Sequence, residues 1–436
     1  MAGRLAIEQS AYKGALVYLN NALHLIQRLP ESQERDQSEL GIQIDYGLAM
    51  LAVKGWYAPE YGGACQRAHE ICRILGGSDP RLFSILSGLA NFYNQLPETQ
   101  TSLSYSDEML RLARTAEDSE MLTQAHWAYG RSKFFIGDLV HAHDNFELCL
   151  RSYDPKKHRT LSIQAGQDPG VLARIFDAMT LWILGYADRA QKRADESIAL
   201  ARQLRSPLTL VNCLCMTAKY DSIRHDFKHA ASVIEEGFAL SNEHDFGYYK
   251  QGLVPYQKIG LAAMGKVAEP KTPTVAGRND KLSGVRYEVA QTFARSYLAE
   301  GLGGLGRVDT ALDLVSQAAD LMEHNNERYV EPEIHRIKGE LLLRRALESP
   351  ISAAEVESAE SSAEESFRSA IETARVHSAK SFELRASLSL SQLLKRRNRK
   401  TEAEQILGPL YNWFTEGFDM PELKEAKKLL DELGSS

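Results

Sequence analysis

The spacing of the hydrophobic positions predicts helices along almost the whole chain. Between Met121 and Gly137, apolar and aromatic residues recur at helical intervals and not at every second position. These residues are Leu122, Ala125, Trp127, Ala128, Tyr129, Phe134 and Ile136. The sequence has no stretches rich in Val, Ile and Thr with the two-residue period of a strand. The pattern therefore predicts an all-α protein whose helices are joined by short turns.

A second pattern marks those turns. Glycine or polar turn residues are followed, always five positions later, by an alanine. The pairs are Gly137 and Ala142, Gly185 and Ala190, Asp226 and Ala231, Gly306 and Ala311, and Asn398 and Ala403. The end of the first helix in a hairpin must tolerate left-handed geometry, and a small residue early in the second helix permits close approach. The pattern predicts repeated helical hairpins.

This hairpin pattern resembles the tetratricopeptide repeat (TPR). The best copy is AHWAYGRSKFFIGDLVHAHDNFELCL, residues 125–150, in which Gly137 stands in the turn and Ala142 and Phe146 stand at helix-packing positions. Ala142 and Ala190 are 190 − 142 = 48 residues apart, longer than the ~34 residues of the usual repeat. The resemblance implies a divergent TPR-like α-solenoid, a right-handed superhelix of antiparallel helix pairs.

Longer stretches resemble the C-terminal repeat region of bacterial STAND-type ATPase and class III adenylate (guanylate) cyclase-like signalling regulators. They are residues 53–76, 153–171, 327–343, 379–394 and 411–433. The resemblance implies a sensor or scaffold arm of a signal-transduction or transcription-regulating system, with catalysis in modules outside this sequence. It also implies that the chain is a piece of a larger protein, a split gene product or an independent descendant. No position matches the family's nucleotide-binding or cyclase motifs.

Two glycine motifs imitate nucleotide sites. Gly260-x4-Gly265-Lys266 has the spacing of a phosphate-binding loop, but Val267 stands where a Ser or Thr would hold Mg²⁺. The segment GLGGLG, residues 301–306, has the spelling of a dinucleotide motif. Each follows a predicted helix and not a strand, so we expect helix ends and no bound cofactor.

Candidate metal and catalytic motifs have equally simple structural explanations. His225 and His229 have the spacing of a zinc-hydrolase motif, but Asp226 replaces the general-base Glu and suits the N-cap of a second helix. Asp168 followed by Pro169 predicts another helix start. The basic run KRRNRK, residues 395–400, fits a solvated turn at a helix C-terminus. We predict no catalytic residue and no metal site, and hence no enzyme.

Composition narrows the possible partners. Lysine and arginine total 51 against 58 acidic residues, a net charge of −7, which argues against direct binding of nucleic acid. No apolar run is long enough to cross a membrane, and the N-terminus does not resemble a secretory signal. The five cysteines are scattered, which indicates reduced thiols. These features predict a cytoplasmic protein.

The expected organisation is a single TPR-like solenoid over residues 1–436. We expect an irregular loop at 266–284, because two prolines interrupt the predicted helix there. We also expect an acidic Ser, Ala and Glu insertion at 349–362 and C-terminal capping helices at 401–433.

The predicted function is non-catalytic binding of a protein or peptide on the concave face, which the first helices of the hairpins line. The TPR pattern places the following residues on that face: Gln124, Trp127, Arg131, Phe134, Tyr220, Arg336 and Glu340. A mixed aromatic and charged lining suits protein recognition, although packing between repeats is the favoured explanation for Trp127 and Phe134. Two alternatives remain open, namely a small-ligand (inducer) sensor and a hydrolase of unseen type.

Overall fold

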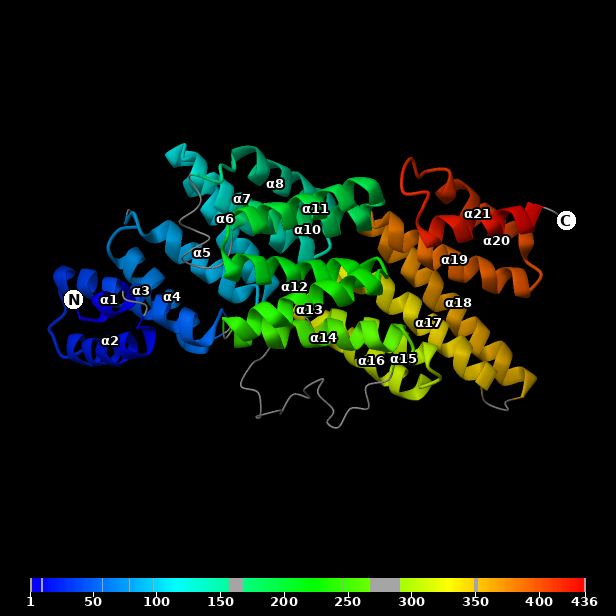
Figure 1. Ribbon diagram of the computed structural model, residues 1–436, viewed down its shortest axis with the longest axis horizontal. Coiled ribbons are helices and arrows are strands. Elements are labelled where there is room, and N and C mark those ends of the chain that lie inside the picture. The colour runs from blue at the N-terminus through cyan, green and yellow to red at the C-terminus, as the bar shows by residue number, and fades with distance from the viewer. Residues whose placement is uncertain are drawn as a thin grey trace. The chain divides into compact units, whose positions relative to one another are not determined.

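The computed structural model describes residues 2–8, 11–56, 58–77, 79–96, 98–156, 168–244, 246–266, 291–348 and 352–434. Within these ranges every regular element is a helix, so the predicted all-α class is confirmed (Figure 1). Contacts between Cα atoms divide the chain into two compact units. Among the described residues, unit 1 comprises those up to Ser132, and unit 2 comprises those from Lys133 onward.

Unit 1 contains the N-terminal helices, and its last helix, α7, continues into unit 2. The helices are α1 (Ala2–Glu8), α2 (Tyr12–Ile26), α3 (Gln33–Lys54), α4 (Pro59–Ile74), α5 (Leu82–Tyr93), α6 (Thr99–Ala116) and α7 (Ser119–Phe135). Consecutive helices pack against one another throughout this series from α1 to α6.

Unit 2 continues the series. Its helices are α8 (Leu139–Ser152), α10 (Pro169–Leu184), α11 (Ala187–Gln203), α12 (Pro207–Ile223), α13 (Phe227–Glu243), α14 (Gly247–Ala263), α15 (Gln291–Gly304), α16 (Val308–Asn325), the 3-10 helix η1 (Arg328–Val330), α17 (Glu331–Glu348), α18 (Ala353–Val376), α19 (Lys380–Arg396), α20 (Lys400–Tyr411) and α21 (Pro421–Gly434).

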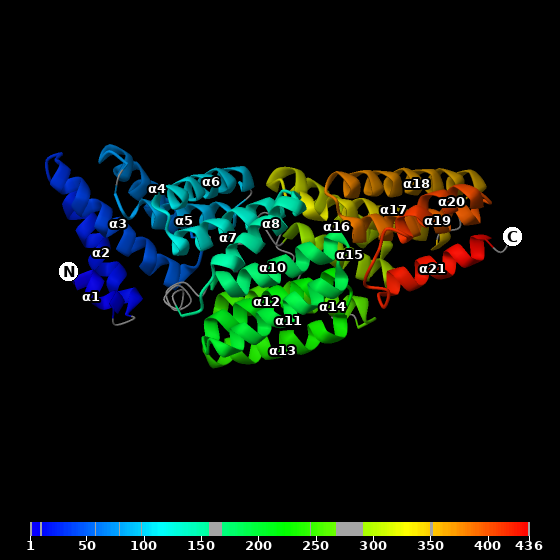
Figure 2. The same cartoon turned by 90° about the horizontal axis from the view of Figure 1, so that it is seen from above.

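The helices of unit 2 form consecutive hairpins, namely α10/α11, α12/α13, α15/α16, α17/α18 and α19/α20 (Figures 1 and 2). The first helices of neighbouring hairpins also touch, as α10 does with α12, α15 with α17 and α17 with α19. We call α10, α12, α14, α15, α17, α19 and the final α21 the A helices. This stacking of helix pairs confirms the predicted TPR-like solenoid.

The predicted turns lie where the glycine and alanine pattern placed them, with one correction. Gly137, Gly185 and Gly306 have positive φ, as does Asn398, and each alanine five positions later is fully buried. In the α12/α13 hairpin the pattern is shifted by one residue. His225, and not Asp226, has the left-handed conformation (φ 61°), and Ala230 is the buried alanine.

Asp226 instead has the capping role that the sequence suggested. Its carboxylate accepts the backbone N–H of His229 and so begins α13, which confirms that His225 and His229 do not share a helix. Asp168 begins α10 in the same way, by accepting the N–H of Val171. Each side chain satisfies one of the backbone donors that a helix N-terminus leaves unpaired.

Both nucleotide-like motifs are helix ends. Gly260 lies inside α14, and Gly265 (φ 75°) follows the last turn of that helix. Gly301 lies inside α15, and Gly306 forms the turn to α16. Because both motifs follow helices, neither has the strand-to-helix context of a phosphate site. Most of the predicted loop at 266–284 lies outside the described residues.

The basic run pairs with the acidic tract and with the part of α18 that follows it, since Arg397 also lies 3.5 Å from Glu360. Arg397 and Arg399, from the run KRRNRK, form ion pairs with Glu364 of α18 at 3.1 and 2.7 Å. Ser352 and Glu355 form a capping box at the start of α18, so residues 353–362 of the acidic tract are helical. Among the described helices, none is both long and apolar enough to span a bilayer.

Candidate functional site

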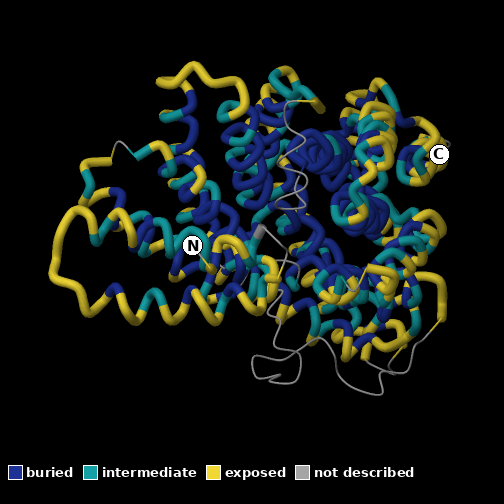
Figure 3. The backbone as a smooth tube through the Cα atoms, turned by 60° about the vertical axis from the view of Figure 1, so that its left-hand side comes forward, coloured by how far each residue is buried: buried dark blue, intermediate teal, exposed yellow. Residues whose placement is uncertain are grey.

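The A helices of unit 2 carry charged side chains, several of which are buried. Figure 3 colours the backbone by burial, with buried residues in dark blue and exposed residues in yellow. We call this group of charged side chains the ion-pair ladder. Its members are His225 in the α12/α13 turn, Glu300 on α15, Glu333, Arg336 and Glu340 on α17, Arg385 on α19, and Glu422 on α21. The ladder exists because stacking brings the same face of successive A helices together.

Arg336 is the centre of the ladder. Its guanidinium contacts three carboxylates, with N–O distances of 2.5 Å to Glu300, 2.7 Å to Glu333 and 2.9 Å to Glu340. Its side chain is only 5% exposed, and that of Glu333 is fully buried. Burial acts to lower the pKa of Arg336, but Glu300 and Glu333 outweigh this effect and hold the pKa well above its usual range. Arg336 is therefore a permanent cation that bridges α15 and α17.

Arg385 extends the ladder to the end of the chain. Its Nη1 lies 3.1 Å from Glu333, and its Nη2 lies 2.6 Å from Glu422. Burial acts to raise the pKa of Glu422, but Arg385 overcomes this effect and lowers it. At the other end, Nε2 of His225 lies 3.2 Å from a carboxylate oxygen of Glu300. The ladder thus adds α19, α21 and the α12/α13 turn to the pair of helices α15 and α17.

The ladder has more negative than positive charge. Its four carboxylates are those of Glu300, Glu333, Glu340 and Glu422. Besides the imidazole of His225, its basic groups are the two guanidiniums of Arg336 and Arg385. Glu300 and Glu340 are partly exposed, at 22% and 29% of their side-chain surface. The partly exposed part of this face is therefore acidic.

A second buried charge, on the A helix α12, lies beside four aromatic rings. The ammonium of Lys219, on α12, is 4.8–5.9 Å from the ring centroids of Phe134, Phe135, Phe293 and Tyr329. Such distances permit cation–π attraction. Burial nevertheless lowers the pKa of Lys219 to about 8, against the opposing effect of Glu327.

Glu327, which precedes η1, is the counter-charge of Lys219. Burial raises the pKa of Glu327 to about 7, while Lys219 acts to lower it. Both of its carboxylate oxygens are buried without a hydrogen-bond partner of normal geometry among the described residues. A buried polar group without a partner costs free energy, so this position is a candidate for a bound water or a small ligand.

The residues predicted for the concave face are mostly buried. Trp127, Arg131, Phe134, Tyr220 and Arg336 are all less than 9% exposed, whereas Gln124 and Glu340 are partly exposed. On α7, Arg131 donates to Asn91 at 2.8 Å and lies over the ring of Trp127.

Within unit 2, the structure brings two of the predicted residues, Arg336 and Glu340, into direct contact. Phe134 packs on Tyr329, with ring centroids 4.5 Å apart, and Arg336 pairs with Glu340 in the ladder. Sequence reasoning missed Lys219 and Glu333, although the first-helix register that selected Tyr220 and Arg336 also contains them.

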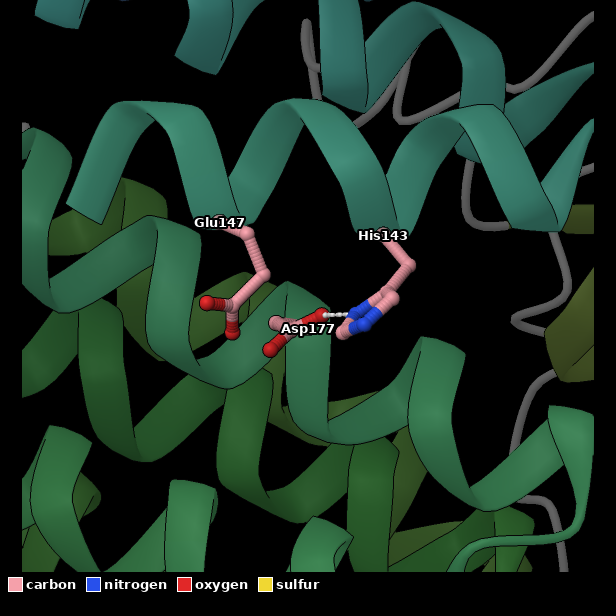
Figure 4. A group of neighbouring side chains, drawn as sticks. All are labelled: His143, Glu147 and Asp177. Atoms are coloured by element: carbon pink, nitrogen blue, oxygen red, sulfur yellow. Dashed lines mark hydrogen bonds and ion pairs between the residues drawn. The ribbon is translucent and has the colours of Figure 1, made fainter. Parts of the chain in front are cut away.

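A smaller cluster lies on the outer side of the hairpins, where α8, α10 and α11 border an open groove of about 760 Å³. Figure 4 shows His143 and Glu147 of α8 facing Asp177 of α10. Candidate ligand atoms of these three side chains all lie within 4.8 Å of one another, which resembles a metal site. His143 Nδ1 is hydrogen-bonded to Asp177 at 2.7 Å.

Arg193 accounts for this cluster without a metal. Its Nε lies 3.1 Å from Asp177, and its Nη2 is paired with Glu147. The hydrogen bond with Asp177 raises the pKa of His143, and burial raises the pKa of Asp177. Because the chain supplies its own cation to both carboxylates, we interpret the cluster as an ion-pair network between hairpins.

Comparisons with known proteins add no family assignment. No protein-family model and no curated protein matches the chain. Among solved structures, yeast Tom70 has a TM-score of 0.39 with 13% identity, covering 99% of this chain and 94% of that one. A Rap protein complexed with Competence and Sporulation Factor has a TM-score of 0.42 with 10% identity, covering 99% and 96%. At these scores the fold assignment rests on the helix pairs themselves.

Proposed function

We propose that the chain is a non-catalytic protein-interaction and regulatory repeat domain, and that the ion-pair ladder is part of its binding face. The observation that carries this proposal is the presence of charged side chains on a face that packing alone would make apolar. Replacing a buried ion pair by hydrophobic residues of similar volume is often neutral or stabilising. A role in recognition explains why such a face carries Arg336, Arg385 and their carboxylates.

The excess of carboxylates favours a basic partner. Four carboxylates face two guanidiniums, and Glu300 and Glu340 are partly exposed. A peptide or protein segment that carries Lys or Arg would neutralise this excess, whereas an acidic segment would be repelled. Electrostatic complementarity of this kind contributes to specificity and to association rate.

A binding experiment with matched peptides tests the proposal. Fluorescence anisotropy would compare a labelled Lys/Arg-containing peptide with the same peptide after Lys/Arg→Glu replacement. We expect binding of the basic peptide only, weakened about fivefold for each of Glu300→Gln and Glu340→Gln, the factor that corresponds to about 1 kcal/mol. Glu357→Gln and Glu372→Gln on exposed positions of α18 are the controls. Equal binding of both peptides, or equal loss in the control variants, would refute the assignment.

The signalling context is a further part of the proposal. The stretches that resemble the repeat regions of bacterial STAND-type ATPases and cyclases suggest a cognate ATPase or cyclase module as the partner, with this chain as its sensor or scaffold arm. Co-expression with such a module from the same genome, followed by size-exclusion chromatography, tests this. Co-elution that Glu300→Gln with Glu340→Gln abolishes would support it, and separate elution of the unaltered proteins would contradict it.

The small-ligand alternative is favoured by one observation, the buried carboxylate of Glu327. A small cationic ligand would supply hydrogen-bond donors of normal geometry to this carboxylate. Thermal shift assays with methylammonium and guanidinium salts test the idea, with NaCl as the ionic-strength control. A rise in Tm that Glu327→Gln abolishes would favour the sensor, and a rise that persists in this variant would exclude Glu327 as the site.

A further inference from the structure

A loop near the C-terminus closes unit 2 on itself. The loop, residues 412–420, joins α20 to α21 and contacts the start of α11, more than 200 positions earlier in the chain. Glu416 accepts the backbone N–H groups of Asp188 at 3.0 Å and Arg189 at 3.1 Å. In return, Gly417 donates its N–H to the Asp188 carboxylate at 3.3 Å. The two segments therefore hold each other through reciprocal hydrogen bonds.

Glu416 takes the place of a missing helix cap. Tyr186, the N-cap residue of α11, offers no side-chain hydrogen bond to that helix. By contrast, Asp168, Ser206 and Asp226 each cap the helix that follows them. The first N–H groups of a helix need acceptors, and a carboxylate is favoured there by the helix dipole. For α11 the acceptor comes from the far end of unit 2.

Further contacts complete this closure, which we call the seam. Ser381 of α19 donates its hydroxyl to the backbone carbonyl of Trp182 on α10 at 2.5 Å. Trp413 covers the turn after α10, where a Cβ on Gly185 would lie 2.7 Å from its ring. A hydrogen bond of 3.1 Å also connects His377 to the carbonyl of Gly137. These seam contacts come from turns, a loop and helix ends.

The seam and the ladder occupy the same helices. Arg385 of the ladder lies on α19 one turn after Ser381, and its guanidinium lies over the ring of Trp182, 4.7 Å from the centroid. Glu422 of the ladder lies on α21, just after the loop that contains Glu416. Separation of the loop from α11 would therefore free the end of unit 2 that covers the buried part of the ladder.

We propose that residues 412–420 form a latch, in which Glu416 holds unit 2 closed over the charged face of the A helices. Release of Glu416 from α11 opens the seam and gives a partner access to the carboxylate of Glu333. This inference rests on the proposed function of that face and adds its regulation. Hydration of these charged groups in the open state lowers the free-energy cost of opening the seam.

Thiol labelling measures the opening of the seam. In a Ser381→Cys protein the new thiol lies between α19 and α10, and it reacts only when the seam opens. We expect Glu416→Ala to accelerate its labelling about tenfold, the factor expected when a helix cap is lost, with Glu416→Gln intermediate. Ser391→Cys is the matched control, because Ser391 is equally buried on α19 but faces α20. Mass spectrometry assigns the label to each cysteine.

The outcomes separate a latch from general destabilisation. Faster labelling at position 381 alone supports the latch, whereas unchanged labelling at both positions, or equal acceleration at both, overturns it. Amide hydrogen exchange in the single Glu416→Ala variant also distinguishes a latch from general destabilisation, and it needs no new cysteine. Exchange should rise at 181–184 and 380–384 and stay constant at 211–223 of α12. Without this local rise the latch is refuted.

The same variants distinguish failure of the latch from failure of the proposed function. If labelling does not respond to Glu416→Ala while basic peptides still require Glu300 and Glu340, the latch is wrong and the binding face stands. If labelling shows that the seam opens but no basic peptide binds, the binding face is wrong.

Discussion

Replacement of Arg336 by Met tests whether the ladder is shielded from water and whether its charged side chains stabilise one another. The change keeps a long side chain and removes one buried cation that contacts three carboxylates at 2.5–2.9 Å. Removal of one partner from a buried ion pair costs about 3–5 kcal/mol, because the remaining charge is left uncompensated. Glu333 keeps Arg385, and Glu340 keeps the hydroxyl of Ser389, so we expect the lower end of this range.

The stability that Arg336→Met is expected to lose depends on pH. Arg336 helps to hold the pKa of Glu300 well below its usual value, against the opposing effect of burial. A carboxylate with a lowered pKa contributes stability above its unfolded pKa of about 4.5 and loses it as pH falls through the folded value. The difference between the parent and Arg336→Met should therefore be full at pH 7 and shrink below about pH 4.5.

Urea denaturation followed by circular dichroism measures this difference as a shift in the midpoint. Arg368→Met is the matched control, because Arg368 also pairs with two carboxylates, Glu364 and Glu402, but its side chain is 46% exposed. The control should lose less than about 1 kcal/mol. Equal losses in Arg336→Met and Arg368→Met, or a loss that does not change with pH, would show that water screens the ladder and would refute the reasoning.

Three further predictions follow from other positions. Ala142 is fully buried in its hairpin, so Ala142→Leu should destabilise by about 1–3 kcal/mol through overpacking, and an unchanged Tm would contradict the hairpin packing. Because burial lowers the pKa of Lys219 to about 8, the parent should gain stability in urea melts as pH rises from 8 to 10, and Lys219→Met should lack this gain. Isothermal titration calorimetry should detect no ATP binding, and a signal abolished by Lys266→Ala would revive the phosphate-loop interpretation of Gly260 to Lys266.

Local features of the fold were predictable from the sequence because they depend on neighbouring residues. The glycines at 137, 185 and 306 mark turns because the backbone there has positive φ. Asp168 and Asp226 mark helix starts because a carboxylate can reach the N–H three residues later. The one-residue error at Asp226 arose because a polar residue can either cap a helix or adopt the left-handed turn, and His225 takes the turn.

The candidate site was only partly predictable, because several of its contacts join residues that are far apart in the sequence. The repeat register selected Arg336 and Glu340, which are one helical turn apart and pair within α17. It did not predict that Arg336 would contact Glu300, 36 residues away, or that Arg385 would contact Glu333, 52 residues away. Periodicity shows which face of a helix is shared with neighbours, but it does not show which charges meet there.

The sequence by itself determined the helices, their turns and the pairing of neighbours, because these depend on contacts within about 40 residues. Tertiary structure alone decided that Glu416 caps α11, that Arg193 fills the cluster of His143, Glu147 and Asp177, and that Lys219 is buried among aromatic rings. These contacts depend on how far each hairpin rotates relative to the previous one. Small rotations accumulate along a solenoid, so side chains distant in sequence meet only when the whole stack is in place.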